Sequence, residues 1–215
     1  MHNPPRSFPK IKVCGLTSAE DARHAIQSGA DAVGVVGVLS SPRGISAEKA
    51  REVFQGLSNN LWKIAVFVNP SPAEALSFLK RADANAVQLC GEENTEDWND
   101  FPFPVFKKWG VAESEEGMHQ RWKQICCGFI LDSPNSPGGT GETVDLVLAQ
   151  RFAAQAPCLL AGGLHAENVG EKVAQIRPAG VDASSALEDS PGIKNKEHVQ
   201  VFIQSAQRAF QRIEQ

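Results

Sequence analysis

Short apolar runs alternate with amphipathic segments along almost the whole chain. The runs have the length of strands and fall at residues 11–14, 32–39, 62–68, 86–89, 104–109, 129–132, 158–161 and 180–183. Most of the segments between them carry apolar residues at helical spacing, as Ala50, Val53 and Phe54 do. About eight strand–helix units in 215 residues predict an α/β chain folded as a single-domain (β/α)₈ barrel. A doubly wound open sheet is the alternative.

Helix starts are marked by side chains that cap free backbone amides. The segments 17–20 (Thr-Ser-Ala-Glu) and 71–74 (Ser-Pro-Ala-Glu) both read as capping boxes, and Ser46 reads as a further N-cap. A weaker helix is predicted over 115–124, where Gly117 interrupts the pattern. Residues 1–9 contain three prolines and no apolar run, so they predict a flexible N-terminal arm ahead of a barrel domain at 10–215.

Composition narrows the class of protein. The net charge of −4 and the absence of a basic run argue against nucleic-acid binding. Apolar stretches are too short to span a membrane, and the start does not resemble a signal peptide. Five cysteines without paired spacing fit a reduced cytoplasm, and no histidine clusters with them to suggest a metal site. No exposed apolar stripe is evident, so we expect a monomer.

Polar and reactive side chains follow several of the predicted strands. They are Cys14, Arg43, Gln88, Cys90 and Asp132, and in a barrel they would meet at the rim formed by the strands' carboxyl ends. Cys14 is suited to act as a base or nucleophile, and a buried structural thiol is the alternative. Asp132 suits a general acid or a simple loop cap. Arg43 suits a substrate carboxylate or an exposed loop.

Three further features lie on the predicted strands or in the loops that follow them. Lys12 shares a strand face with Cys14, and Asp182 shares one with Ser184, so Lys12 and Asp182 could pair inside a barrel or reach water at a rim. Gly162-Gly163 and Ser184-Ser185 follow consecutive strands and predict a phosphate-binding site on backbone amides. The loop at 138–141, which contains Gly139 and Gly141, could be a lid or a second phosphate contact.

These segments together resemble the phosphoribosylanthranilate isomerase family. The matching stretches appear in the family's order from Lys10 onward, and they are KVCGLTSAEDA, GADAVGVV, SPRGIS, AVFVNPS, AVQLCGEE, FILDS, GGTGET, LAGGLHAENV and GVDASSALE followed by PGIKN. Each piece is weak by itself, but the ordered set is specific.

The resemblance implies an Amadori rearrangement of N-(5′-phosphoribosyl)anthranilate in tryptophan biosynthesis, without a cofactor. Asp132 matches the general acid that protonates the furanose oxygen, and Cys14 matches the general base that removes the C2 proton. Arg43 matches the residue that faces the anthranilate carboxylate. The phosphate would lie at Gly162, Gly163, Ser184 and Ser185, under the loop with Gly139 and Gly141, while Gln88 and Cys90 would face the substrate.

The chain departs from the family pattern at three places. Cys90 stands where a histidine is usual, the second strand reads Val35-Val36-Gly37-Val38-Leu39 where aromatic residues are usual, and Ala186 replaces a glycine. These changes leave two alternatives open. One is a related sugar-phosphate aldose–ketose isomerase with an altered aromatic pocket. The other is a non-catalytic, phosphate-binding interaction protein.

Overall fold

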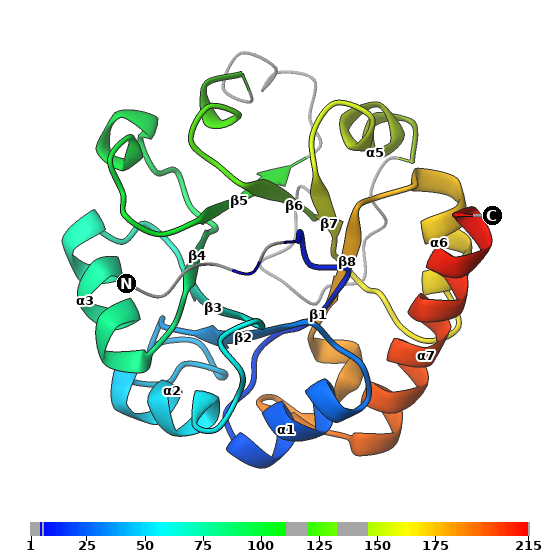
Figure 1. Ribbon diagram of the computed structural model, residues 1–215, viewed down its shortest axis with the longest axis horizontal. Helices are drawn as coiled ribbons and strands as arrows, with labels where there is room; N and C mark the ends of the chain where they lie inside the picture. The colour runs from blue at the N-terminus through cyan, green and yellow to red at the C-terminus, as the bar shows by residue number, and fades with distance from the viewer. Residues whose placement is uncertain (1–4, 6, 111–119, 133–145, 215) are drawn as a thin grey trace.

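Eight parallel strands close into a barrel in the computed structural model, which describes residues 5, 7–110, 120–132 and 146–214 (Figure 1). The strands are β1 (Ile11–Val13), β2 (Ala32–Val36), β3 (Trp62–Phe67), β4 (Ala86–Leu89), β5 (Val105–Gly110), β6 (Gly128–Asp132), β7 (Cys158–Leu160) and β8 (Gly180–Ala183). They pair in chain order, and β8 pairs with β1. The predicted barrel is therefore confirmed over the open sheet.

The helices surround the barrel, as Figure 1 shows. They are α1 (Ala19–Gln27), α2 (Ala47–Phe54), α3 (Pro72–Ala82), α5 (Leu146–Ala153), α6 (Val169–Ile176) and α7 (Lys196–Ile213), with 3₁₀ turns η1 (Thr95–Trp98) and η3 (Ser185–Leu187). The first half of the helix predicted at 115–124, residues 115–119, lies outside the described residues.

The capping predictions are confirmed for two helices and shifted for the first. Ser71 and Glu74 form the reciprocal capping box of α3, and Ser46 accepts a hydrogen bond from the amide of Lys49 at the start of α2. The first helix is capped by Ser18, one residue later than expected from the box pattern. Thr17 instead donates its hydroxyl to the Gly192 carbonyl at 2.6 Å, because a neighbouring hairpin competes for it.

That hairpin was not predicted. It pairs β9 (Glu188–Ser190) with β10 (Ile193–Lys194) in an antiparallel ribbon that follows β8 and η3. The second predicted strand is also shorter than expected, because the chain leaves the sheet after Val36. Backbone hydrogen bonds from Ser41 to Val38 and from Gly44 to Ser41 fold the rest of that apolar run into the turn that carries Arg43.

Two apolar layers hold the barrel together. The larger lies between the sheet and the helices, and it includes Val33, Phe54, Leu79, Phe129 and Phe202. The smaller fills the inside of the barrel, and its members are Ala32, Trp62, Ile64, Ala86, Phe106, Ile130, Leu159 and Ala161. Phe8 packs on Phe106, with ring centroids 5.8 Å apart, so residues next to the N-terminus contact the barrel. The predicted arm at 1–9 and the domain boundary after it stay predictions.

We expect Phe106→Ala to lower the free energy of unfolding by about 3–5 kcal/mol, because the ring is fully buried and the site cannot collapse around the lost volume. Urea denaturation at pH 7 measures the change. Val201→Ala on α7 is the control, since Val201 is 40% exposed and should cost far less. Equal losses for the two variants would contradict an internal core centred on Phe106.

Candidate active site

The carboxyl ends of the strands surround a cavity of about 420 Å³, a size suited to a small metabolite. Residues from β1, β2, β3, β4, β5, β6, β7 and β8, or from the loops directly after them, contribute to its wall. Of the predicted site residues, the cavity is lined by Cys14, Arg43, Gln88, Cys90, Asp132, Gly162, Gly163, Ser184 and Ser185. Gly139 and Gly141 lie outside the described residues.

Cys14 stands directly after β1, where its amide still donates a hydrogen bond to the Ala183 carbonyl at 2.9 Å. Gly15 follows with a φ of 75°, which turns the chain out of the sheet. A Cβ at Gly15 would lie 2.7 Å from the Arg43 side chain and 2.8 Å from the Ser184 hydroxyl. The glycine therefore lets three cavity residues approach each other closely.

The Cys14 thiol is neutral at rest. Burial raises its pKa above the ordinary value of 9.0, and the neighbouring Lys12 ammonium only partly offsets that rise. Room for both side chains comes from Gly34 on β2, where a Cβ would lie 2.9 Å from the Cys14 sulfur and 3.1 Å from Lys12 Cε. A thiolate formed here would have an ammonium group beside it.

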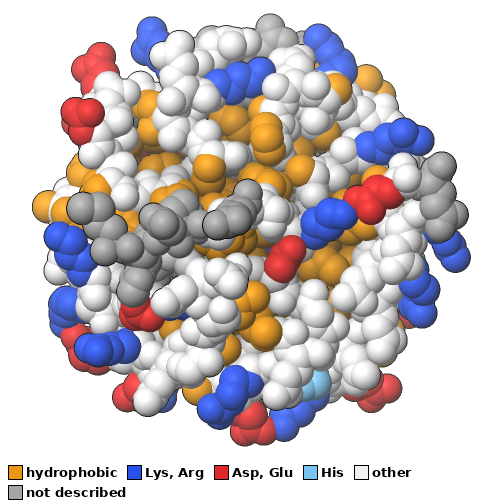
Figure 2. Space-filling model, in the orientation of Figure 1, with side chains coloured by type: hydrophobic (Ala, Val, Ile, Leu, Met, Phe, Trp, Pro, Cys, Tyr) orange, Lys and Arg blue, Asp and Glu red, His pale blue; other side chains and the backbone are white. Residues whose placement is uncertain are grey.

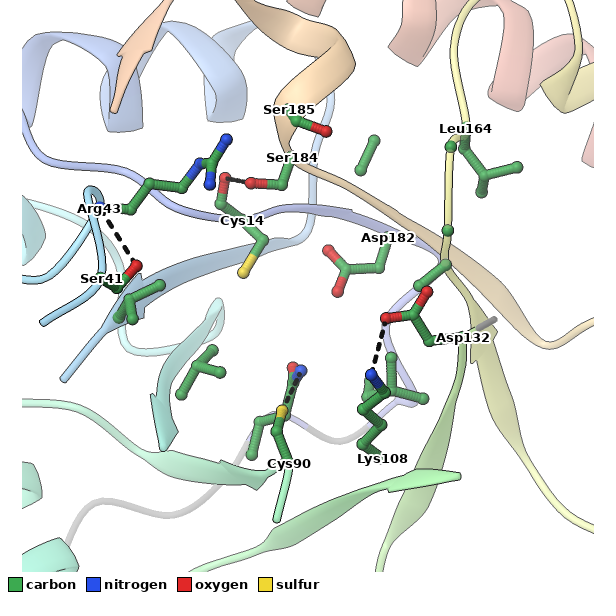
Figure 3. A pocket seen from close by; sticks show the side chains of 18 of the residues that line it. Cys14, Ser41, Arg43, Cys90, Lys108, Asp132, Leu164, Asp182, Ser184 and Ser185 are labelled. Carbon is green, nitrogen blue, oxygen red and sulfur yellow. Dashed lines mark hydrogen bonds and ion pairs between the residues drawn. The ribbon is translucent and has the colours of Figure 1, made fainter. Parts of the chain in front are cut away.

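Asp132 ends β6, and Lys108 of β5 lies beside it. The Lys108 ammonium is 3.3 Å from Asp132 Oδ2, and both side chains are mostly buried (Figure 3). Lys108 was missed from the sequence, although strand alternation gives a signal for it. Phe106 points into the barrel, so Lys108, two residues later, faces the same way.

Asp182 lies between the predicted acid and base in Figure 3, on β8. Its Oδ2 accepts a hydrogen bond from Lys12 Nζ at 2.6 Å, and both side chains are almost fully buried. The predicted internal ion pair is thus confirmed. Burial by itself lowers the pKa of Lys12, but Asp182 and the Cys14 sulfur raise it above its ordinary value, so Lys12 stays charged.

Arg43 is held by a carboxylate that sequence reasoning missed. Its guanidinium donates from Nε and Nη2 to Glu188 at 2.7–3.1 Å, and the Lys194 ammonium donates to the same carboxylate at 2.7 Å. Lys194 also donates to the Ser184 carbonyl at 3.0 Å, and the Ser184 hydroxyl donates to the Cys14 carbonyl at 3.0 Å. One chain of contacts therefore joins Arg43 to the turn after β8.

The two predicted phosphate-binding turns lie side by side on the cavity wall. Gly162 and Gly163 have φ values of 81° and 64°, and Asn168 donates its side-chain amide to the Gly163 carbonyl at 2.9 Å. Within the described part of the chain, the backbone amides of these glycines have no acceptor. Ser184 and Ser185 follow β8 on the same wall. The arrangement presents unused amides, which suit an anion.

Gln88 and Cys90 share a face of β4, as predicted, and both line the cavity. Gln88 Nε2 lies 3.3 Å from the Cys90 sulfur, and burial raises the pKa of Cys90 to about 11. Among the described residues, nothing donates to the buried Gln88 Oε1. Cys90 is therefore a neutral wall residue, and Gln88 keeps an acceptor for a ligand.

Comparison with known proteins identifies the family of this chain. The family model for N-(5′-phosphoribosyl)anthranilate isomerase matches residues 11–205. The chain belongs to the phosphoribosylanthranilate isomerase family. The isomerase of Pseudomonas putida strain GB-1 is 34% identical over 207 residues, which cover 94% of this chain and all of that protein.

Solved structures of the family agree with the barrel. Phosphoribosylanthranilate isomerase from Thermotoga maritima has a TM-score of 0.85 and 34% identity, covering 94% of this chain and all of that one. A second structure of such an isomerase, in complex with reduced 1-(o-carboxyphenylamino)-1-deoxyribulose 5-phosphate, has a TM-score of 0.82, 33% identity and the same coverage. The resemblance stated from the sequence motifs is thus confirmed.

The carboxylate of Glu188 gives a test of the contacts behind Arg43. Burial opposes its ionisation, but hydrogen bonds from Arg43 and Lys194 outweigh that effect and lower its pKa below the ordinary 4.5. The stabilisation is therefore complete above about pH 4.5 and is lost as the pH falls through the lower pKa of the folded state. We expect Glu188→Gln to lower the free energy of unfolding by about 2 kcal/mol at pH 7.

That difference should shrink as the pH falls below 4.5 and through the lower pKa of the folded state, because the protonated wild-type carboxyl then resembles glutamine. Urea denaturation of both proteins across this pH range measures it. Glu52→Gln is the control, since Glu52 is exposed and pairs only with Lys49 within the described residues, at 2.7 Å. A gap between wild type and Glu188→Gln that stays constant with pH would contradict the assignment.

Proposed function

We propose that this chain converts N-(5′-phosphoribosyl)anthranilate into 1-(2-carboxyphenylamino)-1-deoxyribulose 5-phosphate, with Asp132 as general acid and Cys14 as general base. The family assignment identifies an isomerase, and the observation that supports these roles is the placement of the two groups. A carboxyl from β6 and a thiol from the residue directly after β1 lie on opposite sides of one cavity (Figure 3). A sugar held between them can be protonated on one side and deprotonated on the other.

The reaction divides into two proton transfers. The Asp132 carboxyl donates its proton to the furanose oxygen while the bond from C1 to that oxygen breaks, and the anthranilate nitrogen supplies the electrons that form the C1–N double bond. Cys14, as thiolate, then takes the proton from C2, and the electrons of that bond give an enolamine. Loss of the hydroxyl proton and protonation of C1 complete the ketone. No electrons enter or leave overall.

The residues beside Asp132 and Cys14 support these steps. The Lys108 ammonium can hold the Asp132 carboxylate that remains after the first transfer. Lys12 can hold the Cys14 thiolate before the second. Because burial favours the neutral thiol, thiolate formation limits how much of the enzyme is ready to react at neutral pH.

The ends of the cavity fit the ends of this substrate. Val36, Val38, Val66 and Val68 form an apolar wall near Arg43, which suits an aromatic ring carrying a carboxylate. Gly162, Gly163, Ser184 and Ser185 provide the anion site at which we place the phosphate. The structure with the reduced product analogue supports a phosphorylated small molecule of this kind as the substrate.

We further propose a monomeric, cytoplasmic enzyme that uses neither a cofactor nor nucleic acid. The five cysteines are free thiols, as in a reducing compartment. Across the described residues, no helix combines the length and apolar character needed to cross a membrane. The net charge of −4 disfavours a polyanionic partner.

Purified protein should consume freshly generated phosphoribosylanthranilate faster than it decays, followed as loss of substrate fluorescence. We expect Cys14→Ala and Asp132→Asn each to reduce turnover by about 100-fold or more, the scale of an acid–base group. Cys158→Ala is the matched control, because Cys158 is buried behind the cavity and does not line it. Near-normal turnover in both site variants would refute the assigned roles.

Arg43 supplies an independent prediction about binding. We expect Arg43→Lys to raise KM by about tenfold with a smaller effect on kcat, because lysine cannot reproduce the planar guanidinium fork. The test compares the natural substrate with the aniline analogue that lacks the carboxylate. The defect should appear with the natural substrate and vanish with the analogue. An equal defect with both would show that Arg43 does not face the carboxylate.

A further inference from the structure

One carboxylate oxygen inside the cavity has no donor. Asp182 Oδ2 is occupied by Lys12, but Oδ1 is buried and, among the described residues, nothing donates to it. The Asp182 side chain is only 7% exposed. A buried charged acceptor left without a donor is costly, so it marks a position where a further group is expected.

Comparison with the ion pair at the opposite end of the barrel shows what is unusual about Asp182. Lys63 pairs with Asp83 Oδ2, also at 2.6 Å, and the ammonium is likewise buried. The Asp83 side chain, however, is 42% exposed, so water can solvate it. Asp182 lacks that exposure and instead lines the cavity. In Figure 3 its carboxylate lies between Cys14 and Asp132.

The chemistry of the proposed substrate decides what can reach this oxygen. The phosphate and the anthranilate carboxylate carry only acceptors at neutral pH, so neither can approach a carboxylate favourably. The sugar hydroxyls are donors, and the proposed acid and base place the sugar between β1 and β6. Resting on the proposed function, we propose that Asp182 binds the substrate directly, with Oδ1 accepting a hydrogen bond from a sugar hydroxyl while Lys12 fixes Oδ2.

Through Lys12, loss of the Asp182 charge should affect sugar binding and the ionisation of Cys14 in opposite ways, so direct binding can be distinguished from a general disturbance of the site. The ammonium is shared between Asp182 and the Cys14 sulfur. The charges of Asp182 and Lys12 act on Cys14 in opposite directions, since the carboxylate raises the thiol's pKa while the ammonium lowers it, and Lys194 also lowers it. Removing the Asp182 charge should therefore make Cys14 ionise more easily, although it weakens sugar binding.

Asp182→Asn tests this with two ligands and one chemical probe. Calorimetry compares reduced 1-(o-carboxyphenylamino)-1-deoxyribulose 5-phosphate, which carries the sugar hydroxyls, with inorganic phosphate, which does not. We expect the Kd of the reduced analogue to rise about tenfold or more, because a hydrogen bond to a charged group is lost. The Kd of phosphate should change less than twofold. Alkylation of Cys14 by iodoacetamide at pH 8 should become faster.

Asp83→Asn is the matched control. It removes the carboxylate that pairs with the buried Lys63, outside the cavity, and should leave both Kd values and the alkylation rate unchanged. Because Asp182→Asn leaves Lys12 unpaired, the double variant Lys12→Met with Asp182→Asn serves if the single one fails to fold. The double variant should show the same selective loss of analogue binding.

The outcomes separate this inference from the proposed function. Unchanged affinity for the reduced analogue, or equal losses for the analogue and phosphate, would overturn direct binding by Asp182. The first result would mean that only water meets Oδ1, and the second that the substitution disturbs the whole cavity. A wild-type protein without turnover would instead overturn the proposed function, whatever Asp182 binds.

Discussion

Lys12 and Asp182 meet at the seam where the first strand of the chain pairs with the last. They are direct partners in the β1–β8 register, and their ammonium and carboxylate are 2.6 Å apart in the barrel interior. Charges at this depth are tolerated only when they are paired, so closure of the barrel and pairing of these residues require each other. A slip of one residue would turn Lys12 to the helix side and separate the pair. The same register sets Cys14 two residues further on, at the cavity.

A second set of contacts spans the rim above that seam. Arg43, from the loop after β2, and Lys194, from β10, share the Glu188 carboxylate, and Lys194 continues to the Ser184 carbonyl. The β9–β10 hairpin thus joins the proposed carboxylate site to the proposed phosphate site. Because both ends of the substrate would be held by one connected framework, the distance between them is fixed before binding. That distance also fixes where the sugar lies relative to Cys14 and Asp132.

The sequence predicts much of this fold because its signals are local. Strand-length apolar runs and the capping box at Ser71 depend on a few neighbouring residues, and both are present in the structure. The hairpin at 188–194 carries no apolar alternation, because its partners are Arg43 and Thr17 from distant parts of the chain. Tertiary contact explains the shifted cap of α1 in the same way, since Thr17 is drawn to Gly192.

The same contrast between local signals and tertiary contacts applies to the candidate site residues. Cys14, Arg43 and Asp132 could be selected because reactive side chains follow predicted strands. Glu188 and Lys194 were not selected, since their positions depend on a hairpin that the sequence pattern did not predict. Strand alternation predicts that Lys108 faces the barrel interior. The neighbouring Lys107 has the same charge but makes a different contact, with Glu93 behind the cavity. Only the register of β5 distinguishes the two lysines.

The described charges around the cavity do not cancel, and their imbalance matches the proposed substrate. Lys12 is paired with Asp182, and Lys108 with Asp132, whereas Arg43 and Lys194 share the single carboxylate of Glu188. The group formed by Arg43, Lys194 and Glu188 therefore has a net charge of one positive unit, between the proposed carboxylate site and the proposed phosphate site. An anionic substrate is attracted to that region, while the centre of the cavity stays locally neutral.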